Sequence, residues 1–151
     1  MTSLNGKFIL IIDDDQAMLR ALTKVLAGEG GLVTSACWAG EAIDHLTDKF
    51  DRYDLVITDL RMPILGGETI LRAVKNALPH IPVIVITAFG NPQAKDECFR
   101  NGAAAFLEKP LETPELLAAI DNAFASAGAH TAHRPRDAKR TDDSDDFRLS
   151  R

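Results

Sequence analysis

The sequence has little cysteine, few aromatic residues and no long hydrophobic run. Its two cysteines, Cys37 and Cys98, are too few for a disulfide framework and are typical of a protein in a reducing compartment. Aromatic residues make up 6% of the chain, so aliphatic side chains must fill the core. The apolar run Phe8 to Ile12 is too short for a signal-peptide core or a membrane span. We therefore expect a cytoplasmic protein with no membrane segment.

An excess of positive charge is also missing. The chain has 17 basic and 22 acidic residues, a net charge of −5, which argues against an extended surface that binds nucleic acid directly. The 151 residues are close to the length of one average domain, and the hydrophobic share of 46% is ordinary for a globular protein. Composition thus excludes several classes of protein and indicates no function.

The composition changes near Gly128. Residues 128–151 are rich in both basic and acidic side chains, and their only large apolar residues are Phe147 and Leu149. Such a segment buries too little apolar surface to offset the entropy lost on ordering. We predict one folded domain over residues 1–127 and a disordered polar tail over residues 128–151.

Short aliphatic runs recur along residues 1–127 and alternate with segments of helical periodicity. Several runs are continuously apolar, as is typical of parallel strands covered on both faces. Asn91-Pro92 and Thr113-Pro114 each place a capping residue before a proline at the first helical position. The pattern predicts an α/β fold, a doubly wound five-stranded parallel sheet with five helices. The predicted strands are Phe8–Ile12, Gly31–Ser35, Asp54–Thr58, Val83–Thr87 and Ala104–Leu107.

Polar residues follow these strands. In an open parallel sheet, ligands bind beyond the carboxyl ends of the strands, where Asp13, Asp14 and Asp59 should meet. Two carboxylates about 4 Å apart repel by about 4 kcal/mol at an effective dielectric constant of about 20, so three of them need a proton or a cation. Oxygen ligands of this kind suit Mg²⁺, or Mn²⁺ in its place. We assign Asp13 and Asp14 to the metal, and Asp15 to capping of the next helix.

Thr87 and Lys109 end two further strands and add a hydroxyl donor and a compact positive charge to the same edge. Such a set can stabilise a phosphoryl group on a carboxylate, since phosphoryl transfer requires mainly positioning and charge neutralisation. Asp59 is the best acceptor because it is alone at a strand end. Each motif by itself is weak evidence, but their arrival at one edge favours a functional site.

At these residues the chain resembles a receiver domain of two-component response regulators, of the stand-alone kind seen in chemotaxis regulators. The resemblance covers about residues 6–127 and implies a flavodoxin-like sheet in the order 2-1-3-4-5. It rests on five motifs in order, namely Ile11–Asp15, Ile57–Pro63, Gly66-Gly67, Val85–Ala88 and Phe106–Pro110.

The resemblance implies a role for each residue at the acidic end. Asp59 would accept a phosphoryl group from a phosphohistidine on a sensor histidine kinase or a histidine phosphotransfer protein. Asp14 would bind the metal directly, Asp13 chiefly through water, and Arg61 through its backbone carbonyl. The protein would thus be a phosphoacceptor in signalling and not an enzyme in the ordinary sense.

The resemblance also implies a switch. Lys109 would pair with a phosphoryl oxygen and precede Pro110 through a cis peptide. Thr87 and Phe106 would be the switch pair, which reshapes the surface made by the fourth helix, fifth strand and fifth helix for a downstream protein partner. The fourth predicted helix, which begins at Pro92, has little apolar surface and suits a movable output face. The expected oligomeric state is a monomer or a weak, phosphorylation-linked dimer.

Two departures from the family pattern stand out. Many relatives have Met-Asp-Gly where this chain has Leu65-Gly66-Gly67, so the loop after Asp59 lacks an acidic residue. Two bulky residues, Arg61 and Phe89, stand two positions after Asp59 and Thr87. We hypothesise that they obstruct the hydrolytic water and make the phosphorylated state long-lived.

Two alternative functions remain. One is a receiver-like scaffold that works without phosphorylation, although the full set of five polar residues argues against it. The other is a Mg²⁺-dependent phosphatase with an aspartyl nucleophile, which would need a second Asp where Arg61 stands. We also expect a stand-alone domain, since the tail is too short and polar to build a helix-turn-helix module.

Overall fold

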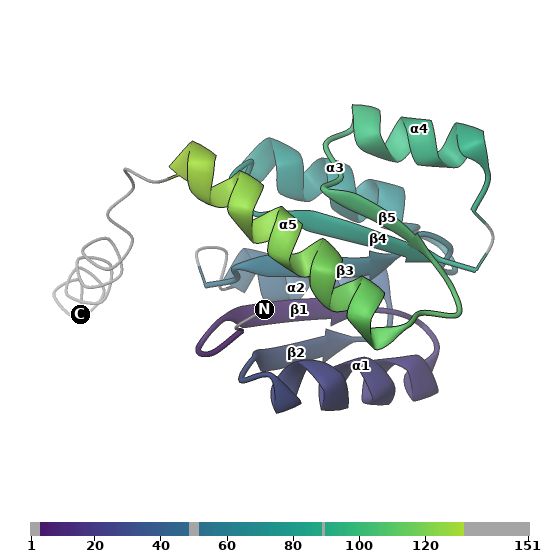
Figure 1. Cartoon of the computed structure of the whole chain (residues 1–151). Helices are drawn as coiled ribbons and strands as arrows, with labels where there is room; N and C mark the ends of the chain where they lie inside the picture. Colours follow the sequence, from purple (N-terminus) through teal and green to yellow (C-terminus); the bar gives the residue numbers. More distant parts are fainter. Residues whose placement is uncertain (1–3, 49–51, 89, 132–151) are drawn as a thin grey trace, which may run out of the picture.

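The structure is a computed structural model that describes residues 4–48, 52–88 and 90–131. Within these ranges strands and helices alternate strictly along the chain (Figure 1). The strands are β1 (Phe8–Ile12), β2 (Leu32–Ala36), β3 (Leu55–Asp59), β4 (Val83–Thr87) and β5 (Ala105–Glu108). The helices are α1 (Gln16–Gly28), α2 (Ala39–Asp48), α3 (Gly67–Ala77), α4 (Pro92–Arg100) and α5 (Thr113–Thr131).

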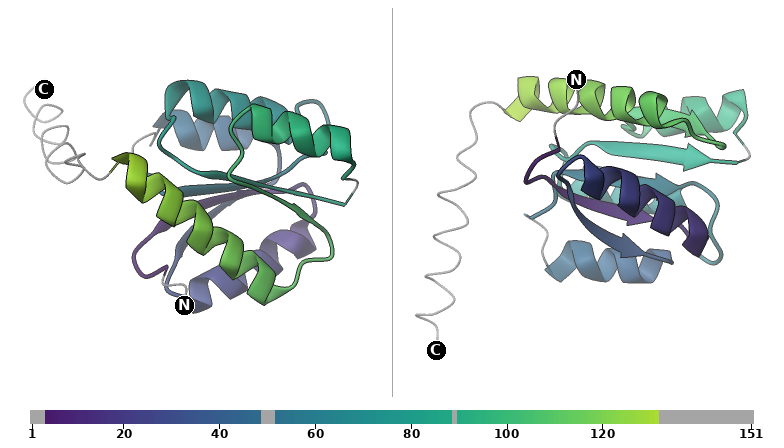
Figure 2. Two further views of the ribbon diagram at one scale, coloured as in Figure 1. Left: turned by 45° about the horizontal axis from the view of Figure 1, so that its top comes forward. Right: turned by 60° about the horizontal axis from the view of Figure 1, so that its bottom comes forward.

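The strands form one parallel sheet in the order β2-β1-β3-β4-β5, which confirms the predicted doubly wound topology. In the left view of Figure 2, α2, α3 and α4 lie on one side of the sheet, and α1 and α5 lie on the other. Every position of β3 and β4 is buried, as the continuous apolar runs predict. The reversal of strand order lies between β1 and β3, the place where open sheets bind ligands.

Successive side chains along a strand point to opposite faces of the sheet, so the protein has two hydrophobic cores, one on each face. On β1, Ile9 and Ile11 pack with α1 and α5, whereas Leu10 and Ile12 pack with α2, α3 and α4. Both cores are almost entirely aliphatic, consistent with the scarcity of aromatic residues. No helix in the described part of the chain has both the length and the apolar character required to cross a membrane.

The element boundaries differ slightly from the predicted ones. Strands β2, β3 and β5 begin one residue later than predicted. Asp54, for example, precedes β3, and its side chain accepts a hydrogen bond of 2.9 Å from the Phe8 N–H. Thr113 is the first residue of α5 and not its cap, because the Glu112 carbonyl already accepts the Leu116 N–H. Helix α5 also continues to Thr131, so the first four residues of the predicted tail are helical. The rest of that tail lies outside the described residues.

Candidate functional site

Three carboxylates meet where β1 and β3 end. These strands are neighbours in register, with Ile12 opposite Thr58, so the residues that follow them lie side by side. Carboxylate oxygens of Asp13, Asp14 and Asp59 lie within 4.8 Å of one another. Asp13 and Asp59 are buried, with 2% and 7% of their surface exposed, whereas Asp14 is exposed. The structure therefore brings together the acidic residues that the sequence predicted as a cluster.

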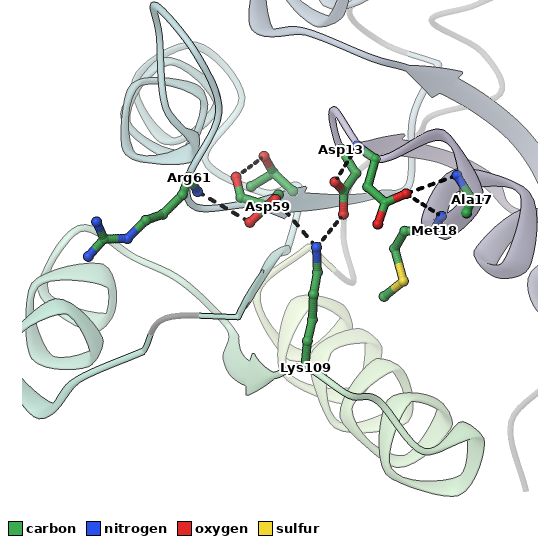
Figure 3. A network of polar contacts seen from close by, with 8 residues as sticks. Asp13, Ala17, Met18, Asp59, Arg61 and Lys109 are labelled. Atoms are coloured by element: carbon green, nitrogen blue, oxygen red, sulfur yellow. Dashed lines mark hydrogen bonds and ion pairs between the residues drawn. The ribbon is translucent and has the colours of Figure 1, made fainter.

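Lys109 reaches between the two buried carboxylates from the loop after β5 (Figure 3). Its Nζ lies 2.8 Å from Oδ2 of Asp13 and 3.4 Å from Oδ2 of Asp59. Burial lowers the pKa of Lys109, but the hydrogen bond and charge of Asp13, together with those of Asp59, raise it above its usual value. The ammonium thus stays charged and offsets part of the carboxylate repulsion. The peptide bond between Lys109 and Pro110 is cis, as the family resemblance implied.

Asp59 is held at the centre of this cluster. Its Oδ1 accepts a hydrogen bond of 3.2 Å from the Arg61 N–H, while Figure 3 shows the Arg61 guanidinium extending away from the carboxylates. Burial raises the pKa of Asp59, and the negative charge of Asp13 adds to this rise. The Arg61 N–H and Lys109 lower the pKa in part, but the net direction is upward. The site thus penalises the ionised form of Asp59 and favours a partner that neutralises its charge.

Asp15 has a different task from its two neighbours. Its side chain accepts hydrogen bonds of 3.0 Å from the Ala17 N–H and 3.3 Å from the Met18 N–H, at the start of α1. Its own N–H donates to Oδ1 of Asp13 at 2.9 Å. The predicted helix cap is confirmed, and the same turn orients Asp13 toward the site.

Thr87 and Phe106 lie on neighbouring strands at the same edge. Thr87 ends β4 and is fully buried, and its carbonyl accepts a hydrogen bond of 2.9 Å from the Lys109 N–H. Phe106 stands on β5 opposite Val85 and is half-buried against the core beneath α4. The predicted switch residues therefore occupy adjacent strands. Phe89, the second residue proposed to slow hydrolysis, lies outside the described residues.

The start of α3 packs against the end of β3 more tightly than the sequence had predicted. A Cβ atom on Gly67 would overlap the carbonyl oxygen of Asp59, and one on Gly66 would lie 2.9 Å from the carbonyl oxygen of Leu60. The Gly67 N–H also donates to the Leu60 carbonyl at 3.0 Å. In the sequence, the glycine pair indicates a family motif and a missing acidic residue, but no packing role was predicted for it. Its position after a strand and before a helix was the signal for a close backbone approach.

The loop between β3 and α3 contains a strained turn. Ile64 has φ of 72° and is 94% exposed, and the Leu65 N–H donates to the Pro63 carbonyl across it at 2.8 Å. A β-branched residue rarely adopts this left-handed conformation. Beside the loop, toward Ala94 of α4, lies a pocket of about 520 Å³ that includes Arg61 and Glu68 in its lining. The region next to Asp59 thus combines a strained turn with a neighbouring surface pocket.

The donor set fits a divalent cation. Three carboxylates contribute hard oxygen ligands within a few ångströms, and the exposure of Asp14 leaves a side open to water and a ligand. Mg²⁺ binds in this manner, through a few carboxylates and retained water, whereas a softer metal would require sulfur or imidazole ligands.

Comparison with known proteins gives a consistent picture. A family model described as the response regulator receiver domain matches residues 9–121. The DNA-binding transcriptional regulator NtrC of Klebsiella pneumoniae is 33% identical over 115 residues, which are 76% of this chain and 24% of NtrC. The chain thus spans about a quarter of that relative's length.

Solved structures show the same fold. A response regulator receiver domain protein from Clostridium thermocellum aligns with a TM-score of 0.75 and 34% identity, covering 80% of this chain and 95% of that one. The CheX–CheY–BeF3–Mg²⁺ complex from Borrelia burgdorferi aligns with a TM-score of 0.76 and 28% identity, covering 80% and 90%. The strand order is therefore that of a known fold.

Proposed function

The chain belongs to the response regulator receiver domain family, and from this premise we propose that Asp59 is its phosphoacceptor. Receiver domains bind Mg²⁺ at an acidic pocket and interact with histidine kinases or phosphotransfer proteins and with downstream targets. One observation carries the proposal: the buried Asp59 carboxylate shares Lys109 with Asp13, in a cluster that Asp14 completes.

The transfer requires no proton from Asp59. An ionised oxygen of Asp59 attacks the phosphorus of a phosphohistidine, a P–O bond forms, and the P–N bond breaks with its electron pair on the imidazole nitrogen. Lys109, already 3.4 Å from Asp59, is placed to pair with a phosphoryl oxygen, and Thr87 supplies a hydroxyl from the next strand. These groups neutralise and position charge, which is most of what phosphoryl transfer demands.

The metal would be held by the acidic cluster. By the family resemblance, Asp14 and Asp59 would supply direct oxygen ligands, Asp13 would act chiefly through water, and Arg61 would offer its backbone carbonyl. When bound, Mg²⁺, or Mn²⁺ in its place, neutralises negative charge on the carboxylates and the phosphoryl group.

Signal output would pass through the surface made by α4, β5 and α5. We assign Thr87 and Phe106 as the pair that couples the phosphoryl group to this surface. Helix α4 suits the task because Cys98 is its only buried residue. The recipient is a protein partner, the chain itself is a monomer or a weak phosphorylation-linked dimer, and no direct contact with nucleic acid is required.

The lifetime of the phosphorylated state is a further part of the proposal. Arg61 and Phe89 flank the phosphoryl site along the chain and would hinder the attacking water, which for Arg61 requires the guanidinium to turn from its position in Figure 3 toward the phosphoryl group. The variant Arg61→Asn, Phe89→Glu should shorten the lifetime of the phosphorylated protein, measured by loss of the phosphoryl mass over time. An unchanged or longer lifetime would reject this role.

The deciding experiment measures phosphorylation by intact mass, with a phosphohistidine donor protein and with Mg²⁺ or a chelator. Wild type should gain the mass of one phosphoryl group only with Mg²⁺, and Asp59→Asn should not gain it. Asp15→Asn is the matched control, because Asn caps a helix as well as Asp and the backbone N–H that residue 15 donates to Asp13 stays in place. A wild type that stays unmodified yet binds a partner would support the scaffold alternative, and turnover of a phosphomonoester would support the phosphatase.

A further inference from the structure

Gly90 lies in the loop between β4 and α4, and the space a side chain would fill there is already occupied. A Cβ on Gly90 would lie 2.9 Å from Cε1 of Phe106 and 3.0 Å from Oε2 of Glu108. Real Cβ atoms almost never approach a neighbour this closely, so the Phe106 ring rests directly on the Gly90 backbone.

The Gly90 backbone does not itself call for glycine. In the described part of the chain, the glycines with left-handed φ are Gly6, Gly30 and Gly102, and Gly90 is not among them. Alanine can adopt the conformation of residue 90 without strain. What distinguishes Gly90 is therefore the room that it leaves for the ring.

This contact joins the two parts of the proposed switch. Phe106 comes from β5, whereas Gly90 lies between Thr87, the last residue of β4, and Asn91, the cap of α4. The Asn91 side chain accepts a hydrogen bond of 2.8 Å from the Ala94 N–H and so begins the helix. Gly90, which the ring contacts, is thus one residue away from Asn91, the cap of α4.

We propose that Gly90 is a positioning residue that seats the Phe106 ring in the resting state, so that a β-carbon at residue 90 displaces the ring and shifts α4 without phosphorylation. The proposal rests on the proposed function, because it assumes that Phe106 and α4 form the output switch. The nearest atom, Cε1 of Phe106, is at the far end of a side chain that can turn about its own bonds, so the ring moves first and the loop backbone before α4 adjusts with it.

Gly90→Ala tests the proposal through deuterium uptake of residues 92–100 in the unphosphorylated protein. We expect the uptake rate of α4 to change by about threefold or more, with α3 unchanged, because α4 is the weakly anchored helix. An α4 uptake rate equal to that of wild type would overturn the proposal. Gly28→Ala is the matched control, since a Cβ there has no neighbour within 4 Å.

Two double variants identify the atom that matters. In a Phe106→Ala background, Gly90→Ala should have no further effect on α4, because no ring remains to be displaced. In a Glu108→Ala background the effect should persist. If the effect instead persists without Phe106 and disappears without Glu108, the Glu108 carboxylate is responsible, and Gly90 does not position the Phe106 ring.

Phosphorylation of Asp59 is measured in the same samples by intact mass. Gly90→Ala should take up the phosphoryl group as wild type does, and its α4 should then change less on phosphorylation than that of wild type. If wild type takes up no phosphoryl group, the proposed function fails. The role of Gly90 is still decided in unphosphorylated protein, by whether the effect of Gly90→Ala on the deuterium uptake of α4 requires Phe106.

Discussion

Helices α3 and α4 occupy equivalent places in the fold but are attached very differently. Each follows a buried strand that ends in a polar site residue, Asp59 before α3 and Thr87 before α4. Helix α3 buries four residues and begins directly against the backbone of β3. Helix α4 buries only Cys98, and its half-buried Ala94 packs against the same core as Phe106 of β5.

The difference separates two requirements of a switch. In the proposed function, the acceptor Asp59 must stay in register with its charge partners, and a tightly packed helix after it favours this. The responding element must change position for a small free energy, and a helix with little buried apolar surface can do so. The difference in burial therefore suits α3 to the fixed part of the proposed switch and α4 to the part that moves.

The largest expected effect is a difference in stability loss when a buried residue is shortened on α3 and on α4. Leu71 on α3 is fully buried, so Leu71→Ala should lower the free energy of unfolding by about 2–5 kcal/mol. Cys98→Ala on α4 removes one buried sulfur and should cost about 1 kcal/mol. Urea unfolding measures both, and equal losses would contradict the contrast between the helices.

A second prediction concerns the start of α3. Gly67→Ala places a Cβ against the Asp59 carbonyl, so the two backbones must separate. We expect the free energy of unfolding to fall by about 1–3 kcal/mol and phosphorylation of Asp59 to slow. Gly28→Ala, in open space on α1, should be neutral or stabilising in the same urea titration. A Gly67→Ala protein as stable and active as wild type would show that α3 does not hold the acceptor.

A third prediction uses the charge at the acceptor. Folding raises the pKa of Asp59 above its usual value of 3.8, so protonation of Asp59 stabilises the folded state. This stabilisation is fully present below pH 3.8 and is lost as pH rises through the pKa of the folded protein. Asp59→Asn should therefore stabilise the protein by about 1 kcal/mol at neutral pH in a chelator, and by less near pH ~4. Urea unfolding across this range tests the sign, and a variant less stable than wild type at neutral pH would contradict it.

The smallest expected effect is local. Asn91→Ala removes the side-chain cap of α4 and should cost about 0.5–1 kcal/mol within that helix. Deuterium uptake of α4 should rise a few-fold, while that of α3 stays as in wild type. Equal changes in both helices would mean that α4 is coupled to the core more firmly than its burial indicates.

Much of the fold could be predicted because its signals are local. The continuous aliphatic runs indicate buried parallel strands, and Asp15 and Asn91 have the side chains that cap helices. The candidate site could be predicted for a topological reason: carboxyl ends of parallel strands converge, so Asp13, Asp59 and Lys109 had to meet once the strands were recognised. The cis peptide at Pro110 followed only from the family resemblance.

The features that escaped prediction depend on contacts between distant segments. Gly67 and Gly90 look alike in the sequence, and only the packed structure shows one against the Asp59 backbone and the other beneath the Phe106 ring. The left-handed Ile64 opposes its own conformational preference, so no local rule indicates it. Helix α5 passes the predicted boundary although Gly128, His130 and Thr131 are poor helix formers, so a boundary set by composition and propensity falls short of it.

The left-handed Ile64 has a consequence for engineering the protein. A side chain that is 94% exposed contributes almost nothing to the core, yet its conformation costs about 1–2 kcal/mol relative to ordinary backbone. The chain therefore carries an improvable position on its surface, far from any packing that a substitution would disturb. A programme to raise the melting temperature would begin at residue 64, in the loop beside the acceptor, before altering a single residue of the interior.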